Sequence, residues 1–255
     1  MRGNSDWEII REDERSPHLH QAIEEVLLEK VSSGERGQTI RFWGDTQKNV
    51  ILGRFQSVKS EVHEREVERD GVEISRRITG GGAMYVEPGS QITYSLYLPE
   101  EMVESNSILE SYPELDGFAV EGLRNLGYDV DYRPVNDICS TSGKVGGAAQ
   151  TRSRGGVLHH TRIAYEMDVG GMVKYLRIGE EKIKDKGIKS AEKAVSPLRE
   201  QRPDIDRPEV VGALVASFSE NCSLVEGEIT EEELEAARRL VREKFGTEGW
   251  IYRFR

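Results

Sequence analysis

The order of strand-type and helix-type runs constrains the fold of this chain more than any other feature. Short runs rich in β-branched and aromatic residues, separated by Gly, Pro, Asn and Asp turns, dominate residues 39–167, and helical periodicity dominates residues 172–245. This order predicts an α+β domain, a mixed and largely antiparallel sheet flanked by helices. The expected strands are 39–43, 50–52, 72–77, 83–85, 92–98, 128–133, 138–139, 144–152 and 157–167. The expected helices are 17–31, 60–70, 107–126, 172–176, 180–186, 208–222 and 231–245.

Composition limits the class of protein. The 255 residues are 36% hydrophobic and 32% charged, enough to bury a core, and no repeat or linker divides them. We therefore expect one domain over residues 1–255, with its core at about 17–250. A formal charge of -11 argues against nucleic-acid or membrane-surface binding. No run approaches the ~20 apolar residues of a membrane span, and the charged N-terminus does not fit a signal peptide, so a cytoplasmic location is expected.

The acidic residues are unevenly distributed. Residues 138–165 contain no Asp or Glu, although the whole chain has 46 of them, and residues 74–86 contain none either. The first stretch holds Lys144, Arg152, Arg154, His159, His160 and Arg162, and the second holds Arg76 and Arg77. Such basic stretches in an acidic protein predict a local site for an anion such as phosphate or carboxylate. Buried strands, in which acids are scarce, are the alternative explanation.

A glycine run gives the strongest local signal. In Arg76-Arg77-Ile78-Thr79-Gly80-Gly81-Gly82-Ala83, three glycines let the backbone approach a ligand closely and present N–H groups to an anion. The two arginines add donors in a fork that suits phosphate or carboxylate. The segment matches neither a Walker loop nor a GxGxxG fingerprint, and a plain glycine hairpin remains the alternative.

Two further segments carry candidate binding groups. Lys144 precedes the small residues Gly146, Gly147 and Ala148 on an expected strand, where a lysine can reach an oxyanion beside a closely packed backbone. A solvated hairpin lysine would give the same pattern. Upstream, Asn136-Asp137 is an oxygen pair of the type that holds Mg²⁺ with substrate phosphates, although an Asx turn is the simpler reading of this dipeptide alone.

Together these motifs resemble the catalytic domain of the lipoate–protein ligase A family, which has the biotin/lipoate ligase fold. That family shows an RRxxGGGA loop, an Asn-Asp-Leu-type strand start, a Lys-x-x-Gly-x-Ala strand and a Leu/Phe-His-His strand, in this order. Here they are 76–83, 136–138, 144–148 and Leu158-His159-His160, and 22–27 is similar to the family's first helix. The resemblance extends from about Ala22 to Trp250.

The resemblance implies a reaction and roles for the matching residues. Lipoate would be activated by ATP to lipoyl-AMP and transferred to a lysine of a lipoyl domain, from a 2-oxoacid dehydrogenase complex or the glycine cleavage H protein. Lys144 would be the catalytic residue, stabilising charge on the phosphate and acyl oxygens. Substrate and nucleotide would be bound by Arg76, Arg77, Gly80, Gly81, Gly82, Ala83, Asn136, Asp137, Gly146, Ala148 and His160, with Mg²⁺ on Asn136 and Asp137. Arg152 and Arg154 would dock the acidic acceptor domain.

The sequence departs from the family pattern in three places. Val86-Glu87 stands where His-Asp is usual after the aromatic residue, and Thr161 stands where Gly or Ala is common. The chain also lacks the small C-terminal accessory domain of full-length ligases. In this respect it resembles the large subunit of the bipartite archaeal-type ligases. A separately encoded accessory subunit is therefore expected for adenylation.

Other activities remain open. An octanoyltransferase of the same fold would move an octanoyl group from acyl carrier protein through a cysteine thioester. Cys139 is the one candidate thiol, because Cys222 is expected to lie in the core. A biotin–protein ligase is disfavoured because its glycine motif differs from RRITGGGA. A non-catalytic binder of lipoate or lipoyl domains is the alternative outside enzymes, against which Lys144 and the glycine loop argue.

Overall fold

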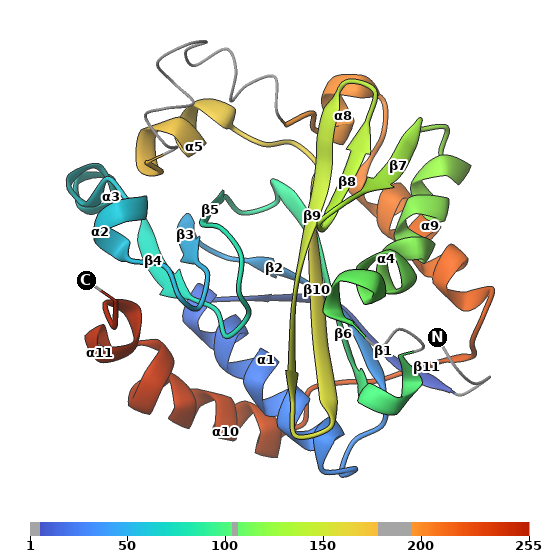
Figure 1. The fold of residues 1–255 in the computed structure, drawn as a ribbon, viewed down its shortest axis with the longest axis horizontal. Helices are drawn as coiled ribbons and strands as arrows, with labels where there is room; N and C mark the ends of the chain where they lie inside the picture. Colours follow the sequence, from blue (N-terminus) through green and yellow to red (C-terminus); the bar gives the residue numbers. More distant parts are fainter. Residues whose placement is uncertain (1–5, 104–106, 178–194, 255) are drawn as a thin grey trace.

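The largest element of the fold is an eight-stranded mixed sheet. The computed structural model describes residues 6–103, 107–177 and 195–254, and its strand order is β11-β1-β2-β6-β10-β9-β8-β7 (Figure 1). β11, β1 and β2 pair in parallel, and the remaining neighbours pair antiparallel. The predicted α+β class is confirmed. The strands are β1 (Trp7–Arg15), β2 (Thr39–Asp45), β6 (Gln91–Pro99), β7 (Val130–Arg133), β8 (Asp137–Ser140), β9 (Gly143–Ser153), β10 (Gly156–Ala164) and β11 (Leu224–Glu226).

A second, three-stranded sheet lies beside the first. Its order is β4 (Glu73–Arg76), β3 (Asn49–Leu52) and β5 (Met84–Val86), so the glycine run forms the connection from β4 to β5. The short helices α2 (Val58–Glu61) and α3 (Glu64–Asp70) lie next to this sheet in Figure 1, and α5 (Val169–Tyr175) packs on β5. The small sheet therefore places the glycine run beside the long strands β9 and β10.

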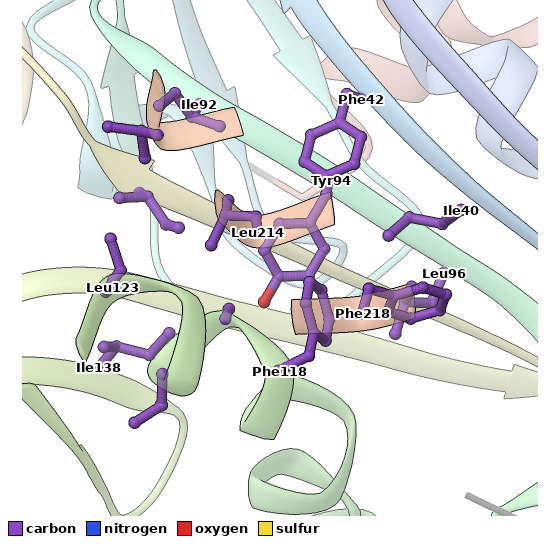
Figure 2. Packing of buried hydrophobic residues seen from close by; sticks show 14 of the residues in the cluster. Ile40, Phe42, Ile92, Tyr94, Leu96, Phe118, Leu123, Ile138, Leu214 and Phe218 are labelled. Carbon is purple, nitrogen blue, oxygen red and sulfur yellow. The ribbon is translucent and has the colours of Figure 1, made fainter. Parts of the chain in front are cut away.

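Helices cover both faces of the large sheet. On one face, α4 (Ile108–Asn125) and α9 (Arg207–Ser219) pack against each other and against β2 and β6, and Figure 2 shows Phe118 of α4, whose ring contacts both Tyr94 of β6 and Phe218 of α9. On the other face, α1 (Pro17–Ser32) lies against β6 and β10 and is covered by α10 (Glu231–Leu240). The smaller helices are η1 (Glu100–Met102), α8 (Leu198–Gln201), the π-helical turn η2 (Val241–Phe245) and α11 (Glu248–Ile251).

Helix starts follow the local sequence. Thr230 accepts a hydrogen bond from the backbone N–H of Glu233, whose side chain accepts from the N–H of Thr230, so α10 begins with a capping box. Ser107 caps α4 in the same way without the return bond. Pro17 occupies the first turn of α1, where a missing N–H costs nothing.

Three expectations differ from the structure, and a fourth falls outside the residues that it describes. The charged N-terminus contains the strand β1, which was not expected there. Its Asp13 is buried and pairs with Arg41, so β1 does not show the alternation of buried apolar and exposed polar residues that marks an ordinary strand. The helix expected at 60–70 is two short helices, because Val62 pairs as a β-bridge with Leu176. The runs 39–43 and 50–52 belong to different sheets. The helix expected at 180–186 lies outside the described residues.

Candidate active site

A cavity of about 250 Å³ lies where the small sheet meets β9 and β10. Residues from α1, β2, β6, α5 and the glycine run complete its wall, and no Asp or Glu from the described part of the chain lines it. The structure brings together nine of the residues singled out in the sequence, namely Arg77, Gly81, Gly82, Ala83, Asn136, Lys144, Gly146, Ala148 and His160. Residues 74–86 and 138–165 thus supply most of this wall.

Arg77 holds the glycine run in place. Its buried guanidinium donates to the carbonyl oxygens of Gly80 (2.7 Å) and Gly82 (2.8 Å), and burial, with Arg162 nearby, lowers its pKa to about 10. Gly53 packs on the run so closely that a Cβ there would lie 2.0 Å from the Gly81 oxygen. The N–H groups of Gly80 and Gly82 donate to no residue within the described ranges and are therefore available to an anion.

Lys144 lies at the exposed edge of the cavity. Its side chain is 40% exposed, and its Nζ is 2.6 Å from Asp137 Oδ1 on the neighbouring strand β8. The ammonium lies over Gly147, where a Cβ would come within 2.8 Å of Nζ. The absent side chain at Gly147 therefore leaves the space that the ammonium occupies.

Asn136 and Asp137 offer few free oxygens to a metal. The Asn136 amide donates to the Ala148 carbonyl at 2.5 Å, and one Asp137 oxygen is engaged by Lys144. Among the described residues no group of three His, Cys, Asp or Glu side chains could hold a metal ion. The remaining oxygens, one carboxylate and one amide, fit Mg²⁺ as it is commonly bound, by one or two carboxylates with substrate phosphates.

His160 connects the cavity to a buried hydrogen-bond chain. Its Nδ1 is 2.9 Å from both Glu24 oxygens on α1, and its Nε2 is 2.9 Å from Thr79 Oγ1. Burial lowers the pKa of His160, and the adjacent His160 helps to keep the pKa of Glu24 low, so a neutral imidazole donates to a carboxylate and accepts from Thr79. Ser95 extends the chain from Glu24 to the indole N–H of Trp43.

The inner wall of the cavity contains charged and aromatic groups to which the sequence analysis gave no role. Arg162 of β10 lies over the Trp43 ring, 4.6 Å from its centroid, and donates to Asp45 Oδ2 at 3.0 Å. Trp43 and Gln91 line the same wall and are almost fully buried. Arg162 was visible as a basic residue in the acid-free stretch, whereas nothing in the local sequence marks Trp43 or Gln91 as cavity residues.

Five predicted site residues lie outside the cavity lining, namely Asp137, which pairs with Lys144, and Arg76, Gly80, Arg152 and Arg154. The buried Arg76 guanidinium donates to backbone carbonyls of the 53–56 turn and of Trp250 and Ile251, and Gly80 only flanks the lining residues. Arg152 is tied to Glu100 at 3.0 Å with 15% of its side chain exposed, and Arg154, at the β9–β10 turn, is 79% exposed. The binding roles of these residues stay predictions.

His159, Cys139 and Cys222 do not line the cavity. His159 points to the opposite face from His160 and contacts Asp116 of α4 at 2.8 Å. Cys139 of β8 stands opposite Lys144 in the strand pairing, and burial with the nearby Asp137 raises the pKa of its thiol. Cys222 follows α9 and packs against the main core.

Two solved lipoate ligase structures are similar to this chain over nearly its whole length. The bi-partite lipoate protein ligase of Thermoplasma acidophilum, described with its E2 lipoyl domain, has a TM-score of 0.84 at 26% identity over 96% of each chain. A lipoate-protein ligase A bound with ATP has a TM-score of 0.83 at 25% identity, covering 97% of this chain and 98% of that one. The chain therefore has the fold of these lipoate ligases.

The family follows from the sequence match. The model of the lipoyl protein ligase A/B catalytic domain matches residues 16–219, so the chain belongs to this family of enzymes. It is 28% identical to a probable lipoate-protein ligase A of Mycoplasma pneumoniae, over 96% of this chain and 70% of the relative. It is 27% identical to the octanoyltransferase LipM of Staphylococcus epidermidis, over 97% and 98%. The resemblance read from the motifs is confirmed, and both ligases and octanoyltransferases are among its relatives.

Proposed function

We propose that this chain is a lipoate–protein ligase that activates lipoate with ATP and transfers the lipoyl group to a lysine of a lipoyl domain. The acceptor belongs to a 2-oxoacid dehydrogenase complex or is the glycine cleavage H protein. Family membership, an ATP-bound relative and a relative described with its E2 lipoyl domain support the proposal. The observation that carries it is the position of Lys144, whose ammonium lies at the cavity edge with the glycine run on the same cavity wall.

The proposed reaction has two steps, and in both of them negative charge must be stabilised at the lipoate carboxyl group and the phosphate bound to it. In the first step a lipoate carboxylate oxygen attacks the α-phosphorus of ATP and pyrophosphate leaves. In the second step the acceptor amine attacks the acyl carbonyl, AMP leaves with its phosphate oxygen, and the amine loses a proton to solvent. Lys144 is positioned to pair with the carboxylate, the phosphate and the developing oxyanion, and the N–H groups of the glycine run add donors. Bound on Asp137 and Asn136, Mg²⁺ would neutralise phosphate charge.

The test compares two lysines in similar surface ion pairs. Wild type, Lys144→Ala and Lys48→Ala are incubated with an apo lipoyl domain and either ATP plus lipoate or preformed lipoyl-AMP, and the lipoylated acceptor is measured by mass spectrometry. Lys48 is a matched control because its ammonium pairs with Glu87 at 2.7 Å and it does not line the cavity. We expect Lys144→Ala to lose roughly 10²–10³-fold in kcat, as when one oxyanion donor is removed, and Lys48→Ala to stay near wild type.

Equal activity of the two lysine variants would contradict the role of Lys144. No product from wild type under any condition would contradict the ligase function itself. We also propose that a separate accessory subunit is needed for adenylation, on the strength of the similarity to the bi-partite ligase. A chain that forms lipoyl-AMP unaided would refute that requirement, and transfer from supplied lipoyl-AMP separates the two steps.

We further propose that the acceptor docks at the β9–β10 turn. Arg154 is the more exposed cation there, 79% exposed and 3.7 Å from Glu29, whereas Arg152 is 15% exposed and held by Glu100 at 3.0 Å. Removing Arg154 then raises the KM for the acceptor while adenylate formation is unchanged, and an equal loss in both steps would argue against this surface.

An octanoyltransferase is the second candidate. Its support is the match to LipM over nearly the full chain and the thiol of Cys139 opposite Lys144. The raised pKa of Cys139 weighs against it, because a thioester-forming cysteine acts as the thiolate. Loss of octanoyl transfer from acyl carrier protein in Cys139→Ser would favour this activity, and unchanged ATP-dependent lipoylation in the same variant would favour the ligase.

A further inference from the structure

The cavity has a cationic residue in its inner wall that the proposed chemistry does not use. Arg162 lines the cavity with only 8% of its surface exposed, whereas 40% of the Lys144 side chain is exposed at the outer edge. In the proposed reaction the acyl carboxylate reacts at Lys144, at the exposed edge of the cavity. The far end of the acyl chain would then lie toward Arg162 and Trp43.

The strand pairing gives the path between the two ends. Gly147, Arg162, Thr93 and Trp43 are register partners across β9, β10, β6 and β2. Neighbouring strands lie about 4.8 Å apart, so this row spans about 14 Å, enough for an extended eight-carbon acyl chain. The Arg162 guanidinium projects along the row to the Trp43 ring, 4.6 Å from its centroid.

Arg162 has a donor without an acceptor. Its Nη1 donates to Asp45, but its Nη2 is buried and has no hydrogen-bond partner in the described part of the chain. Gln21 Oε1, from another residue of the cavity wall, is also buried and unpaired within the same ranges. An unpaired buried polar group costs roughly 1–3 kcal/mol, and because Arg162 borders the cavity, a ligand there can supply the acceptor.

The charges around the inner wall are largely balanced. Asp45 pairs with Arg162, and the ionised Glu24 lies near Arg77, whose guanidinium donates only to backbone carbonyl oxygens among the described residues. A buried guanidinium with an unpaired donor is still an unusual lining for a purely alkyl tail.

We propose that Arg162 is a specificity residue that makes the cavity select acyl chains with a hydrogen-bond acceptor at their far end, such as the dithiolane sulfurs of lipoate, over octanoyl chains ending in a methyl group. This inference rests on the proposed lipoyl-transferring function. An acceptor at the chain end pairs the Arg162 donor, whereas a methyl group buries it unpaired. The selectivity therefore resides in the terminal group, since the two chains have the same carbon length.

The test measures binding of free acids by calorimetry, without ATP or acceptor domain. Lipoate, octanoate and 8-hydroxyoctanoate are titrated into wild type and into Arg162→Met/Asp45→Asn, which removes both members of the ion pair so that no charge is left buried alone. We expect wild type to bind lipoate and 8-hydroxyoctanoate about tenfold more tightly than octanoate, equivalent to about 1.4 kcal/mol. In the double variant this ratio falls to about one.

A second buried pair beside the same ring provides the control. Arg41 lies 5.3 Å from the Trp43 centroid and pairs with the buried Asp13, but it does not line the cavity. Arg41→Met/Asp13→Asn keeps the tenfold ratio if the inference is right. If the double variant does not fold, Arg162→Lys replaces it, because lysine retains the charge with fewer donors. We expect its ratio of lipoate to octanoate affinity to lie between about one and tenfold.

A ratio unchanged in the Arg162 variants, or tighter binding of octanoate by wild type, overturns the inference. These outcomes are distinct from failure of the proposed function, because binding of the free acid needs neither activation nor transfer. A chain that lipoylates its acceptor normally but binds lipoate and octanoate equally tightly refutes only the role of Arg162. A chain that binds selectively but never lipoylates an acceptor refutes only the ligase function.

Discussion

At the scale of single residues, the site depends on a missing side chain as much as on the charged ones. Lys144 was expected to reach an oxyanion from its strand, and the structure adds that its ammonium lies over Gly147 and beside Asp137. Small residues after the lysine were visible in the sequence. Which of them leaves room for the ammonium depends on how β8 and β9 pair, and that was not visible.

Gly147→Ala should reduce activity without reducing stability. The new Cβ would lie 2.8 Å from Lys144 Nζ, so the flexible side chain moves aside and leaves its position next to Asp137. We expect kcat to fall about 10-fold or more, since displacement by about 1 Å can cost 10²-fold, with the free energy of unfolding within about 0.5 kcal/mol of wild type. Lipoylation kinetics and urea unfolding check the two parts.

Gly212→Ala is the matched control, because Gly212 lies in α9 with open space around a Cβ. It should leave kcat unchanged and add roughly 0.5–1 kcal/mol of stability through helix propensity. Wild-type kinetics in Gly147→Ala would contradict the geometry at Lys144.

At the scale of elements, the paired arginines before the glycine run divide their work. Arg77 fixes the run itself, while Arg76 joins the end of β4 to the 53–56 turn and to α11. Trp250 completes the link by donating its indole N–H to the Arg76 carbonyl. Both arginines looked alike in the sequence as candidate anion ligands, and their separation comes from the alternation of side chains at the end of a strand.

Arg76→Lys should loosen the C-terminal segment. Lysine keeps the charge but lacks the planar fork that reaches the carbonyls of Gly53, Gln56 and Ile251. Hydrogen bonds to charged groups contribute about 1.5–3 kcal/mol each, and with one such bond retained by lysine we expect a loss of about 2–4 kcal/mol in the free energy of unfolding. Urea unfolding measures the loss, and hydrogen exchange should show faster exchange at 248–252.

The same substitution at Arg36, whose guanidinium links Glu233 to the Glu228 carbonyl, is a control for general loss of arginine contacts. Arg36→Lys should leave exchange at 248–252 unchanged. Protection of that segment in Arg76→Lys equal to wild type would show that α11 is held by its apolar contacts alone.

Most elements were predictable because their patterns are local. The boundaries of α1, α4, β6, β9 and β10 lie within about three residues of expectation, since periodicity and caps determine them. β1 and β11 were missed because their stability comes from pairing partners far away in sequence. The inner cavity wall was missed for the same reason, since Trp43 and Arg162 meet only through the order of β2, β6 and β10.

At the scale of the whole molecule, the net charge of -11 says little about the site. The titratable groups that line the cavity are cations, a tyrosine and a histidine, with no acid among the described lining residues, so the negative charge lies elsewhere on the protein. The acid-free stretches reflect both explanations offered for them. β8 to β10 are largely buried strands, and they also form the cavity wall.

Buried histidines should make the fold sensitive to mild acid. Burial lowers the pKa of His160 and lowers that of His20 well below its usual 6.5, while the unfolded chain titrates at the usual value. Below pH 6.5 the unfolded chain therefore binds more protons, and stability decreases as the pH falls. Each histidine contributes up to about 1.4 kcal/mol per pH unit, so the two together give about 3 kcal/mol between pH 6.5 and 5.5 at most.

The measurement is the free energy of urea unfolding at pH 8, 7, 6 and 5. We expect a plateau above pH 7 and a progressive loss below 6.5. His160→Gln retains a donor toward Glu24 but no titrating group, so it should lower the stability at pH 8 and reduce the slope below 6.5, to which His20 and the part-buried His18, whose pKa burial also lowers, still contribute. The lowered pKa of Glu24 adds a further loss only below about pH 4.5, which separates its contribution from that of the histidines. Stability that is flat from pH 8 to 5.5 would mean that the imidazoles are as easily protonated inside the protein as in water, and the neutral His160 assigned to the cavity would be wrong.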